Sequence, residues 1–220
     1  MTPRRFARLS AILDHRQTTL TVLLDDLQKA HNVSAVMRTC DAVGVGWIHA
    51  ISDEDRFRAK TTSAAGSEHY VETTLHKDAE AAVSALKGDG FALYAAHLDE
   101  RAVDFRSVDF TQPTCVVLGQ EGPGVSPDLL ERVDGTIAIP MVGAVASLNV
   151  SVAAAVILYE AQRQRQAAGL YDRPHVEEET RQRRLFEWGY RQIAHWCRQR
   201  GYDYPRVGEE GEIVGELPRG

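Results

Sequence analysis

Apolar and polar positions along most of the chain switch between a strand-like and a helix-like spacing. Short apolar runs predict strands, and apolar residues every three or four positions predict helices. The expected strands are residues 20–24, 47–52, 70–75, 91–96, 114–118 and 137–139. The expected helices are residues 3–16, 32–44, 79–87, 127–133, a long one from residue 150, and a polar helical region at 172–200. This alternation predicts an α/β domain with a largely parallel sheet, followed by a tail at 201–220.

Polar side chains stand where two of these helices are expected to begin. Asn32 is predicted to cap one helix, which glycine ends at Gly44. Ser147 and Asn149 are both candidate caps of the long helix. The first half of that helix, residues 150–159, is apolar on every side, which predicts burial all round, by its own domain or by a partner.

Two segments of small residues follow expected strands in the second half of the chain. LGQEGPGVS covers residues 118–126, and residues 141–149 follow a strand that stops at Pro140, which cannot donate to a sheet ladder. Pockets in parallel sheets lie beyond the carboxyl ends of strands, so these loops are candidates for holding a ligand against backbone groups. Neither GxxxxGK[ST] nor a strand-linked GxGxxG is present, which argues against a kinase or a dinucleotide oxidoreductase.

The composition narrows the class of protein. Of the 220 residues, 44% are hydrophobic and 25% are charged, as in ordinary globular proteins. We expect no membrane helix and no secretory signal, because no apolar run of sufficient length is present. Cys40, Cys115 and Cys197 form no CxxC pair and are expected to be reduced structural thiols in a cytoplasmic protein. The histidines show no ligand spacing, so no metal site is expected.

The charge is distributed unevenly. The net charge is −6, yet 21 of the 25 basic residues are arginines that crowd the two ends of the chain. Residues 1–16 hold four arginines and residues 161–200 hold nine, whereas acids outnumber bases between 100 and 160. This pattern favours phosphate binding by a rim made of the two ends of the chain. The acidic middle of the chain would then have another function. The alternative, a merely solvated helix face, stays open.

Three motifs, in order, resemble the SpoU/TrmH branch of the SPOUT RNA methyltransferases. They are HNVSAVMRTCDAVGV (31–45), VVLGQEGPGVS (116–126) and IPMVGAVASLNVSVAAAVILYE (139–160). The resemblance spans about residues 19–160, and the flanking helices are similar to those of the branch that methylates guanosine 18 of tRNA. It implies a SPOUT-type parallel sheet with a deep C-terminal trefoil knot, a rare feature. It also implies a homodimer, with parts of the knot at the interface.

The resemblance also implies site residues. The catalytic set is Arg38, Asn32, Glu121, Ser147 and Asn149. The S-adenosyl-L-methionine contacts, mostly through backbone groups, are Ala96, Leu118, Gly119, Ile139, Met141 and Leu148. Many relatives carry threonine where this chain has Ala96. A larger residue at Gly119 is expected to fill cofactor space.

The expected roles differ in how well chemistry supports them. A guanidinium seldom loses a proton, so Arg38 is expected to grip a phosphate and stabilise a developing alkoxide. The alternative is that Arg38 is an ordinary surface arginine without a catalytic role. Glu121 is as well explained by a structural role, tying loop amides together, as by direct catalysis. Asn149 is expected near the substrate ribose and Ser147 near the methyl donor.

The expected function is methyl transfer from S-adenosyl-L-methionine to the 2′-hydroxyl of guanosine 18 in the tRNA D-loop, without a metal. The expected layout is an N-terminal helical extension (1–18), a catalytic domain (19–166) and a C-terminal tRNA-binding extension (167–220). The terminal arginines are expected to bind the tRNA backbone. Two alternatives stay open: another tRNA position or ribosomal RNA as the target, and a non-catalytic RNA-binding module.

Overall fold

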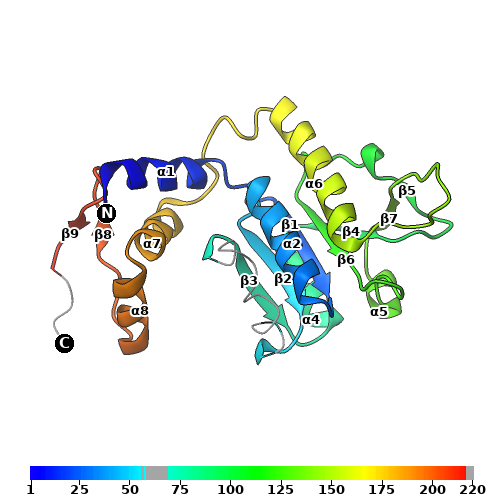
Figure 1. The fold of residues 1–220 in the computed structure, drawn as a ribbon, viewed down its shortest axis with the longest axis horizontal. Helices are drawn as coiled ribbons and strands as arrows, with labels where there is room; N and C mark the ends of the chain where they lie inside the picture. Colours follow the sequence, from blue (N-terminus) through cyan, green and yellow to red (C-terminus); the bar gives the residue numbers. More distant parts are fainter. Residues whose placement is uncertain (56, 58–68, 217–220) are drawn as a thin grey trace. The chain divides into compact units, whose positions relative to one another are not determined.

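A computed structural model describes residues 1–55, 57 and 69–216, and the chain forms two compact units (Figure 1). The first unit joins both ends of the chain, residues 1–16 and 171–220, and the second is residues 17–170. Contacts between segments so far apart in sequence leave no trace in local periodicity. Residues 217–220 of the expected tail lie outside the described residues.

The second unit is built on a seven-stranded sheet in which every pairing is parallel. The strand order is β3-β2-β1-β6-β4-β7-β5. The strands are β1 (Leu20–Asp25), β2 (Trp47–Ile51), β3 (Glu72–His76), β4 (Ala92–Ala96), β5 (Val103–Asp104), β6 (Thr114–Leu118) and β7 (Gly135–Ala138). The expected α/β class is therefore confirmed. The two-residue β5 is too short for its sequence to have shown an alternation.

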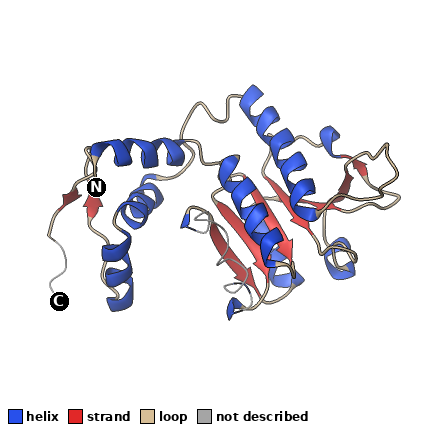
Figure 2. Ribbon diagram, viewed as in Figure 1, coloured by secondary structure: helices blue, strands red, loops and turns tan. Residues whose placement is uncertain are grey.

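Helices cover both faces of this sheet (Figure 2). They are α2 (Ala30–Ala42), α4 (Ala79–Gly88), α5 (Pro127–Leu130) and α6 (Val150–Ala167), with a 3-10 turn η2 (Phe105–Ser107). One core cluster joins α2 and α6 to the sheet, and the other joins α4 and α5. Burial from both faces explains why β1 and β6 are buried along their whole length.

Helix α6 is buried on one face only. Ala154, Ile157 and Leu158 are almost fully buried, whereas Val152 is 47% and Tyr159 52% exposed. The chain alone does not provide the expected burial all round. Burial of the second face by a partner stays a prediction.

The first unit contains α1 (Pro3–Asp14), α7 (Glu178–Gly189), α8 (Arg191–Arg200), β8 (Arg206–Val207) and β9 (Ile213–Val214). The expected helical region at 172–200 is confirmed from Glu178 onward, whereas residues 172–177 are not helical. The expected tail is not a simple tail, because β8 and β9 pair antiparallel and Val207 is buried. The amino group of Met1 donates to the carbonyl of Gly211 at 3.0 Å, so this segment is tied to the start of the chain. Strands of two residues have no periodicity that a sequence reading can detect.

Some arginines expected on a phosphate-binding rim are buried instead. Arg165 is fully buried, and its guanidinium donates to the carbonyls of Phe110 (2.8 Å), Thr19 (2.6 Å) and Gln112 (3.1 Å). It joins the end of α6 to the segments before β1 and β6. Arg16 is also buried, with its guanidinium carbon 5.8 Å from the centre of the Trp188 ring. These two side chains stabilise the fold and are withdrawn from the rim.

All three cysteines are buried thiols without a disulfide bond, as expected. Among the described residues no helix is both long enough and apolar enough to cross a bilayer.

Candidate active site

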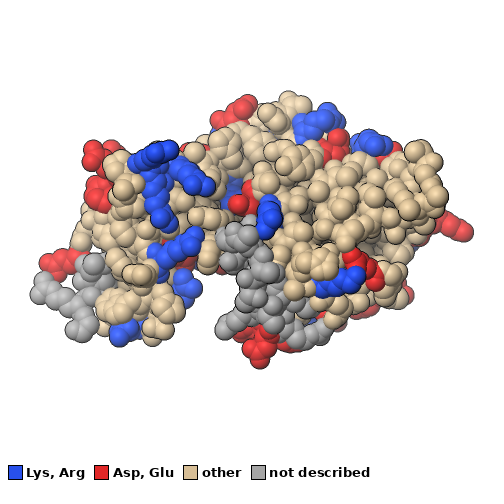
Figure 3. Space-filling view, viewed as in Figure 1, with Lys and Arg blue, Asp and Glu red and all other residues tan. Residues whose placement is uncertain are grey.

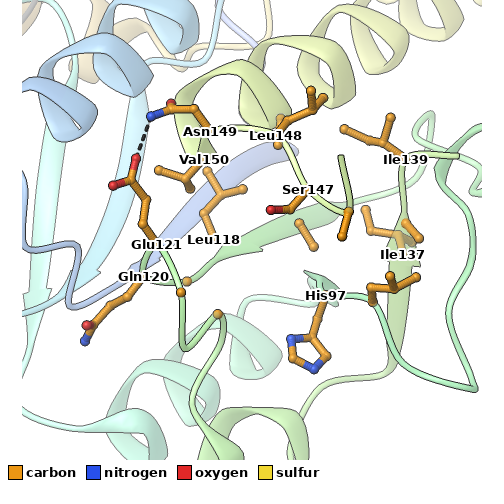
Figure 4. Close-up of a pocket in the computed structure, with 18 of the residues that line it drawn as sticks. His97, Leu118, Gln120, Glu121, Ile137, Ile139, Ser147, Leu148, Asn149 and Val150 are labelled. Atoms are coloured by element: carbon orange, nitrogen blue, oxygen red, sulfur yellow. Dashed lines mark hydrogen bonds between the residues drawn. The ribbon is translucent and has the colours of Figure 1, made fainter. Parts of the chain in front are cut away.

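A cavity of about 580 Å³ opens at the carboxyl ends of β4, β6 and β7 (Figure 4). Its walls come from the loop after β6, the segment between β7 and α6, and the first turns of α6. Leu118, Ile137 and Ile157 contribute apolar surface to it. His97, Ser147 and Asn149 are among the polar residues of the lining. A cavity of this size, with both apolar and polar walls, suits a cofactor-sized ligand.

The loop after β6 is pinched into a tight turn. The amide of Gln120 donates to the carbonyl of Gly124 at 2.9 Å, and the amide of Gly124 donates back to Gln120 at 2.9 Å. Gly122 and Gly124 have positive φ angles of 94° and 76°, a region that favours glycine. The turn therefore presents backbone groups to the cavity in a fixed conformation.

Gly119 has a structural reason to lack a side chain. A Cβ there would lie 2.1 Å from the carbonyl carbon of Gly124 and 2.2 Å from the amide nitrogen of Val125. The chain's own backbone occupies this space, so a Cβ at position 119 would meet Gly124 and Val125 first, and the expected loss of cofactor affinity stays a prediction. A side chain at position 119 would displace the loop that lines the cavity.

A carboxylate joins three elements beside the cavity. Glu121 Oε1 accepts from Asn32 Nδ2 at 2.9 Å and from Asn149 Nδ2 at 2.5 Å, and the second contact is drawn in Figure 4. Asn149 Nδ2 also donates to Asn32 Oδ1 at 3.2 Å. Glu121 Oε2 forms an ion pair with Lys29. Three of the five expected catalytic residues are thus in direct contact.

These donors keep the Glu121 carboxylate ionised. Its pKa is lowered, first by the hydrogen bond from Lys29 and then by that from Asn32. A carboxylate with a lowered pKa is a weak base, and both of its oxygens are engaged. The arrangement favours the structural interpretation of Glu121 over proton abstraction.

The sequence predicts a helix-capping role for both Asn32 and Asn149, and only Asn149 has that role. Asn149 caps α6, because its Oδ1 accepts from the Ser151 amide at 2.8 Å. Asn32 is not a cap: α2 begins two residues earlier, and its N-cap position is Lys29, whose side chain makes no capping bond. Asn32 is 2% exposed and is directed to Glu121 instead. Capping preferences cannot foresee a partner 89 positions away.

The other expected residues divide into those at the cavity and one outside it. Ser147 lines the cavity, as do all six expected cofactor contacts: Ala96, Leu118, Gly119, Ile139, Met141 and Leu148. Arg38 is exposed on α2 and is not among the described residues that line the cavity. Six residues along a helix correspond to about 9 Å, so Arg38 lies well beyond Asn32 on the same helix.

Two residues at the site were missed from the sequence. Lys29 holds Glu121 by an ion pair, and His97 lines the cavity next to the glycine turn. A Cβ on Gly124 would lie 3.1 Å from His97 Nδ1. The signal for His97 was its place directly after the carboxyl end of β4. Lys29 gave no comparable signal.

Comparisons with known proteins identify relatives along nearly the whole chain. The model of the SpoU rRNA Methylase family matches residues 19–159, and that of the SpoU rRNA methylase C-terminal region matches residues 163–216. The tRNA (guanosine(18)-2′-O)-methyltransferase of Escherichia coli K12 is 48% identical over 218 residues, covering 98% of this chain and 95% of that protein.

Solved structures agree with these relatives. The crystal structure of the Aquifex aeolicus TrmH/SpoU tRNA modifying enzyme matches with a TM-score of 0.78 at 41% identity, covering 86% of this chain and 97% of that one. The SpoU methyltransferase AviRb of Streptomyces viridochromogenes, in complex with the cofactor AdoMet, matches with a TM-score of 0.59 at 25% identity. That match covers 70% of this chain and 59% of AviRb.

Proposed function

The chain belongs to the SpoU rRNA Methylase family, and from this premise we propose that it methylates the ribose 2′-hydroxyl of guanosine 18 in tRNA. The methyl donor is S-adenosyl-L-methionine, the cofactor bound by the related AviRb. The observation that supports this most strongly is the cavity, whose lining joins all six expected cofactor contacts to Ser147, Asn149 and Glu121.

The cavity suits this cofactor in size and in chemistry. Its volume of about 580 Å³ lies within the range for small-molecule sites, and its apolar surface can cover an adenine ring. The fixed turn at 120–124 provides main-chain groups that can form hydrogen bonds with the polar edge of the adenine. When bound, S-adenosyl-L-methionine supplies an electrophilic methyl group on a sulfonium. The chain then has to bring the ribose hydroxyl into line and stabilise the charge that develops on its oxygen.

Arg38 provides the charge stabilisation. A guanidinium is a cation and a very poor base, so Arg38 acts through its charge and not by taking the proton. From its exposed position it grips a substrate phosphate and stabilises the alkoxide, while the proton leaves to water or to a phosphate oxygen.

Asn32, Glu121 and Asn149 act as positioning residues. The ionised Glu121 fixes both carboxamides, which orients Asn149 at the start of α6 and holds the turn at 120–124 against α2. Asn149 lies near the ribose and Ser147 near the methyl donor in this proposal. Loss of the carboxylate would leave the Asn32 carboxamide without its acceptor and Asn149 Nδ2 with only Asn32 Oδ1.

The working form is a homodimer with a knotted catalytic unit. The exposed face of α6, with Val152, Val156 and Tyr159, is the surface that a second copy covers. We place the knot in the C-terminal half of this unit, where small residues would allow chain segments to cross closely: Gly119, Gly122, Gly124, Gly143, Ala144 and Ala146.

The first unit binds the tRNA backbone. It holds 13 arginines against 11 acids, whereas the second unit holds 12 basic residues against 20 acids. Figure 3 shows basic side chains gathered on the visible face of the unit that contains α1, α7 and α8. Phosphate contacts of this kind dominate the affinity for folded RNA. A tRNA substrate and three buried thiols support a cytoplasmic location.

Transfer of labelled methyl groups to two synthetic tRNAs tests the proposal. One tRNA carries guanosine at position 18 and the other carries 2′-deoxyguanosine there, so that only the accepting hydroxyl differs. We expect full labelling of the first and none of the second. Equal labelling of both tRNAs, or labelling of ribosomal RNA alone, would contradict the proposed target.

A further inference from the structure

The first unit contains a hollow of about 700 Å³ that the reaction described above does not use. It lies between the start of α7 and residues 202–206, and Tyr202 forms part of its wall. Tyr202 is 37% exposed, which leaves a large aromatic surface in contact with solvent. An exposed aromatic ring beside a hollow of this size is a candidate binding surface.

The Tyr202 ring is backed by a second aromatic ring and a cation. Its centre lies 5.4 Å from that of Trp196, at an interplanar angle of 45°. The guanidinium carbon of Arg200 lies 5.0 Å from the centre of the Trp196 ring. Aromatic rings and guanidinium planes are the groups on which proteins stack unpaired bases.

The backbone holds this wall in place before any ligand binds. Helix α8 ends at Gly201 with a φ of 67°, and the amide of Tyr202 donates to the carbonyl of Cys197 at 3.0 Å. The next tyrosine, Tyr204, packs against Phe186 with ring centres 5.0 Å apart. A fixed ring loses little conformational entropy on binding.

Charges around the hollow distinguish a nucleotide from other ligands. Glu178, Glu179 and Asp203 repel a phosphate but can accept hydrogen bonds from the N–H groups of a base. Arg183 and Arg206, which are exposed on the same lining, attract phosphate. A nucleotide carries both a base with N–H donors and a phosphate, whereas an acidic peptide would be repelled by the three carboxylates.

We propose that this hollow, with Tyr202 as its stacking wall, binds one unstacked nucleotide of the RNA substrate. The inference rests on the proposed function for its RNA partner, and it adds a second contact apart from the methylated guanosine. The base lies on Tyr202 with its polar edge toward the carboxylates, and its phosphate lies toward Arg206. The site contributes affinity and takes no part in methyl transfer.

Two substitutions of Tyr202 separate the effect of base stacking from the effect of side-chain volume. Tyr202→Leu keeps apolar volume and removes the aromatic face, whereas Tyr202→Phe keeps the face and removes only the hydroxyl. We expect Tyr202→Leu to weaken tRNA binding about tenfold, at the lower end of the range for loss of one stacked base. Tyr202→Phe should bind like the unaltered protein, and both variants should keep its single-turnover rate at saturating tRNA.

Hexauridylate bearing 5-iodouridine provides a test without any variant. After irradiation with the full-length protein, we expect the crosslink in the peptide that contains Trp196 and Tyr202. Unchanged tRNA affinity in Tyr202→Leu together with a crosslink elsewhere would overturn the inference. So would equal weakening in Tyr202→Phe, since that would point to the hydroxyl. Neither result would affect the assignment of guanosine 18, because labelling of the two synthetic tRNAs decides that separately.

Discussion

At the scale of single residues, the most informative contact is between Glu121 and the carboxamides of Asn32 and Asn149. The sequence could indicate that all three belong to one site only through a family resemblance, because they are 28 to 117 positions apart. It assigned Asn32 to a helix cap, since asparagine before an apolar helix usually has that role. The structure shows that a tertiary partner takes precedence over this local preference.

Replacement of Glu121 distinguishes a positioning residue from a base. Glu121→Gln retains an oxygen that can accept from the asparagines, so we expect kcat to fall by about fivefold, equivalent to about 1 kcal/mol. Glu121→Ala removes every acceptor and should cause a much larger loss. Single-turnover methylation of both variants provides the measurement. Equal and complete loss in the two variants would indicate that Glu121 takes the proton.

Arg38→Ala should leave cofactor affinity and dimer mass nearly unchanged while lowering kcat roughly 100-fold, about 2.7 kcal/mol of lost transition-state stabilisation. Arg38→Lys should restore little, because a compact ammonium cannot reproduce a planar grip on a phosphate. Single-turnover rates at saturating protein separate chemistry from tRNA binding. A normal rate with weaker tRNA affinity would reduce Arg38 to a phosphate clamp.

At the scale of elements, the sequence predicted the central strands and most helices because buried parallel strands and amphipathic helices have strong periods. The carboxyl ends of β6 and β7 were expected to form a ligand site, and both border the cavity. The short pairs, β5 with β7 and β8 with β9, could not be predicted, because two residues define no period. Their partners lie in other segments and are fixed by packing.

Strands β2 and β3 contain a pair of stacked histidines, from which we predict that the second unit is destabilised by acid. His49 Nδ1 lies 2.9 Å from His76 Nε2, and the rings stack with centres 5.2 Å apart. Burial is the main cause that lowers the pKa of His49 to about 4, and the charge of His76 lowers it further. Asp89 acts in the opposite direction on His49, as Asp78 does on His76.

The free energy of unfolding should therefore fall as the pH drops from about 6.5 to about 4. In this window the unfolded chain binds a proton at His49 that the folded chain does not bind. His49→Gln should flatten the dependence of Tm on pH over this window. His195→Gln, a change at an exposed histidine of α8, serves as the control and should leave the slope as it is. An unchanged slope in His49→Gln would show that other groups cause the acid sensitivity.

At the scale of the whole molecule, the sequence predicted uneven charge but misjudged which arginines are available. Arg165 and Arg16 are buried in the two units, and the side chain of Arg184 is only 12% exposed and paired with Glu187. Neutralising the run of Arg181, Arg183 and Arg184 would thus disturb packing as well as tRNA binding. Burial of a long cationic side chain depends on tertiary partners that no linear charge count contains.

The exposed face of α6 gives a prediction for the assembly. Val156→Glu should place a charge in the proposed interface and convert the dimer to a monomer, because an unpaired buried charge is costly. Val103→Glu is a suitable control, since Val103 is an equally apolar, 47% exposed valine that belongs to β5 and not to α6. Light scattering gives the mass of each variant. A dimer that survives Val156→Glu would place the interface elsewhere.

The most direct test of the central claim is a map of 2′-O-methylation across total tRNA and ribosomal RNA, from cells with and without this protein. The account predicts that guanosine 18 of tRNA alone loses its methyl group when the protein is absent. Expression of the unaltered chain should restore that methyl group, and expression of Arg38→Ala should not. Loss of methylation at another tRNA position or in ribosomal RNA, with guanosine 18 unaffected, would contradict it.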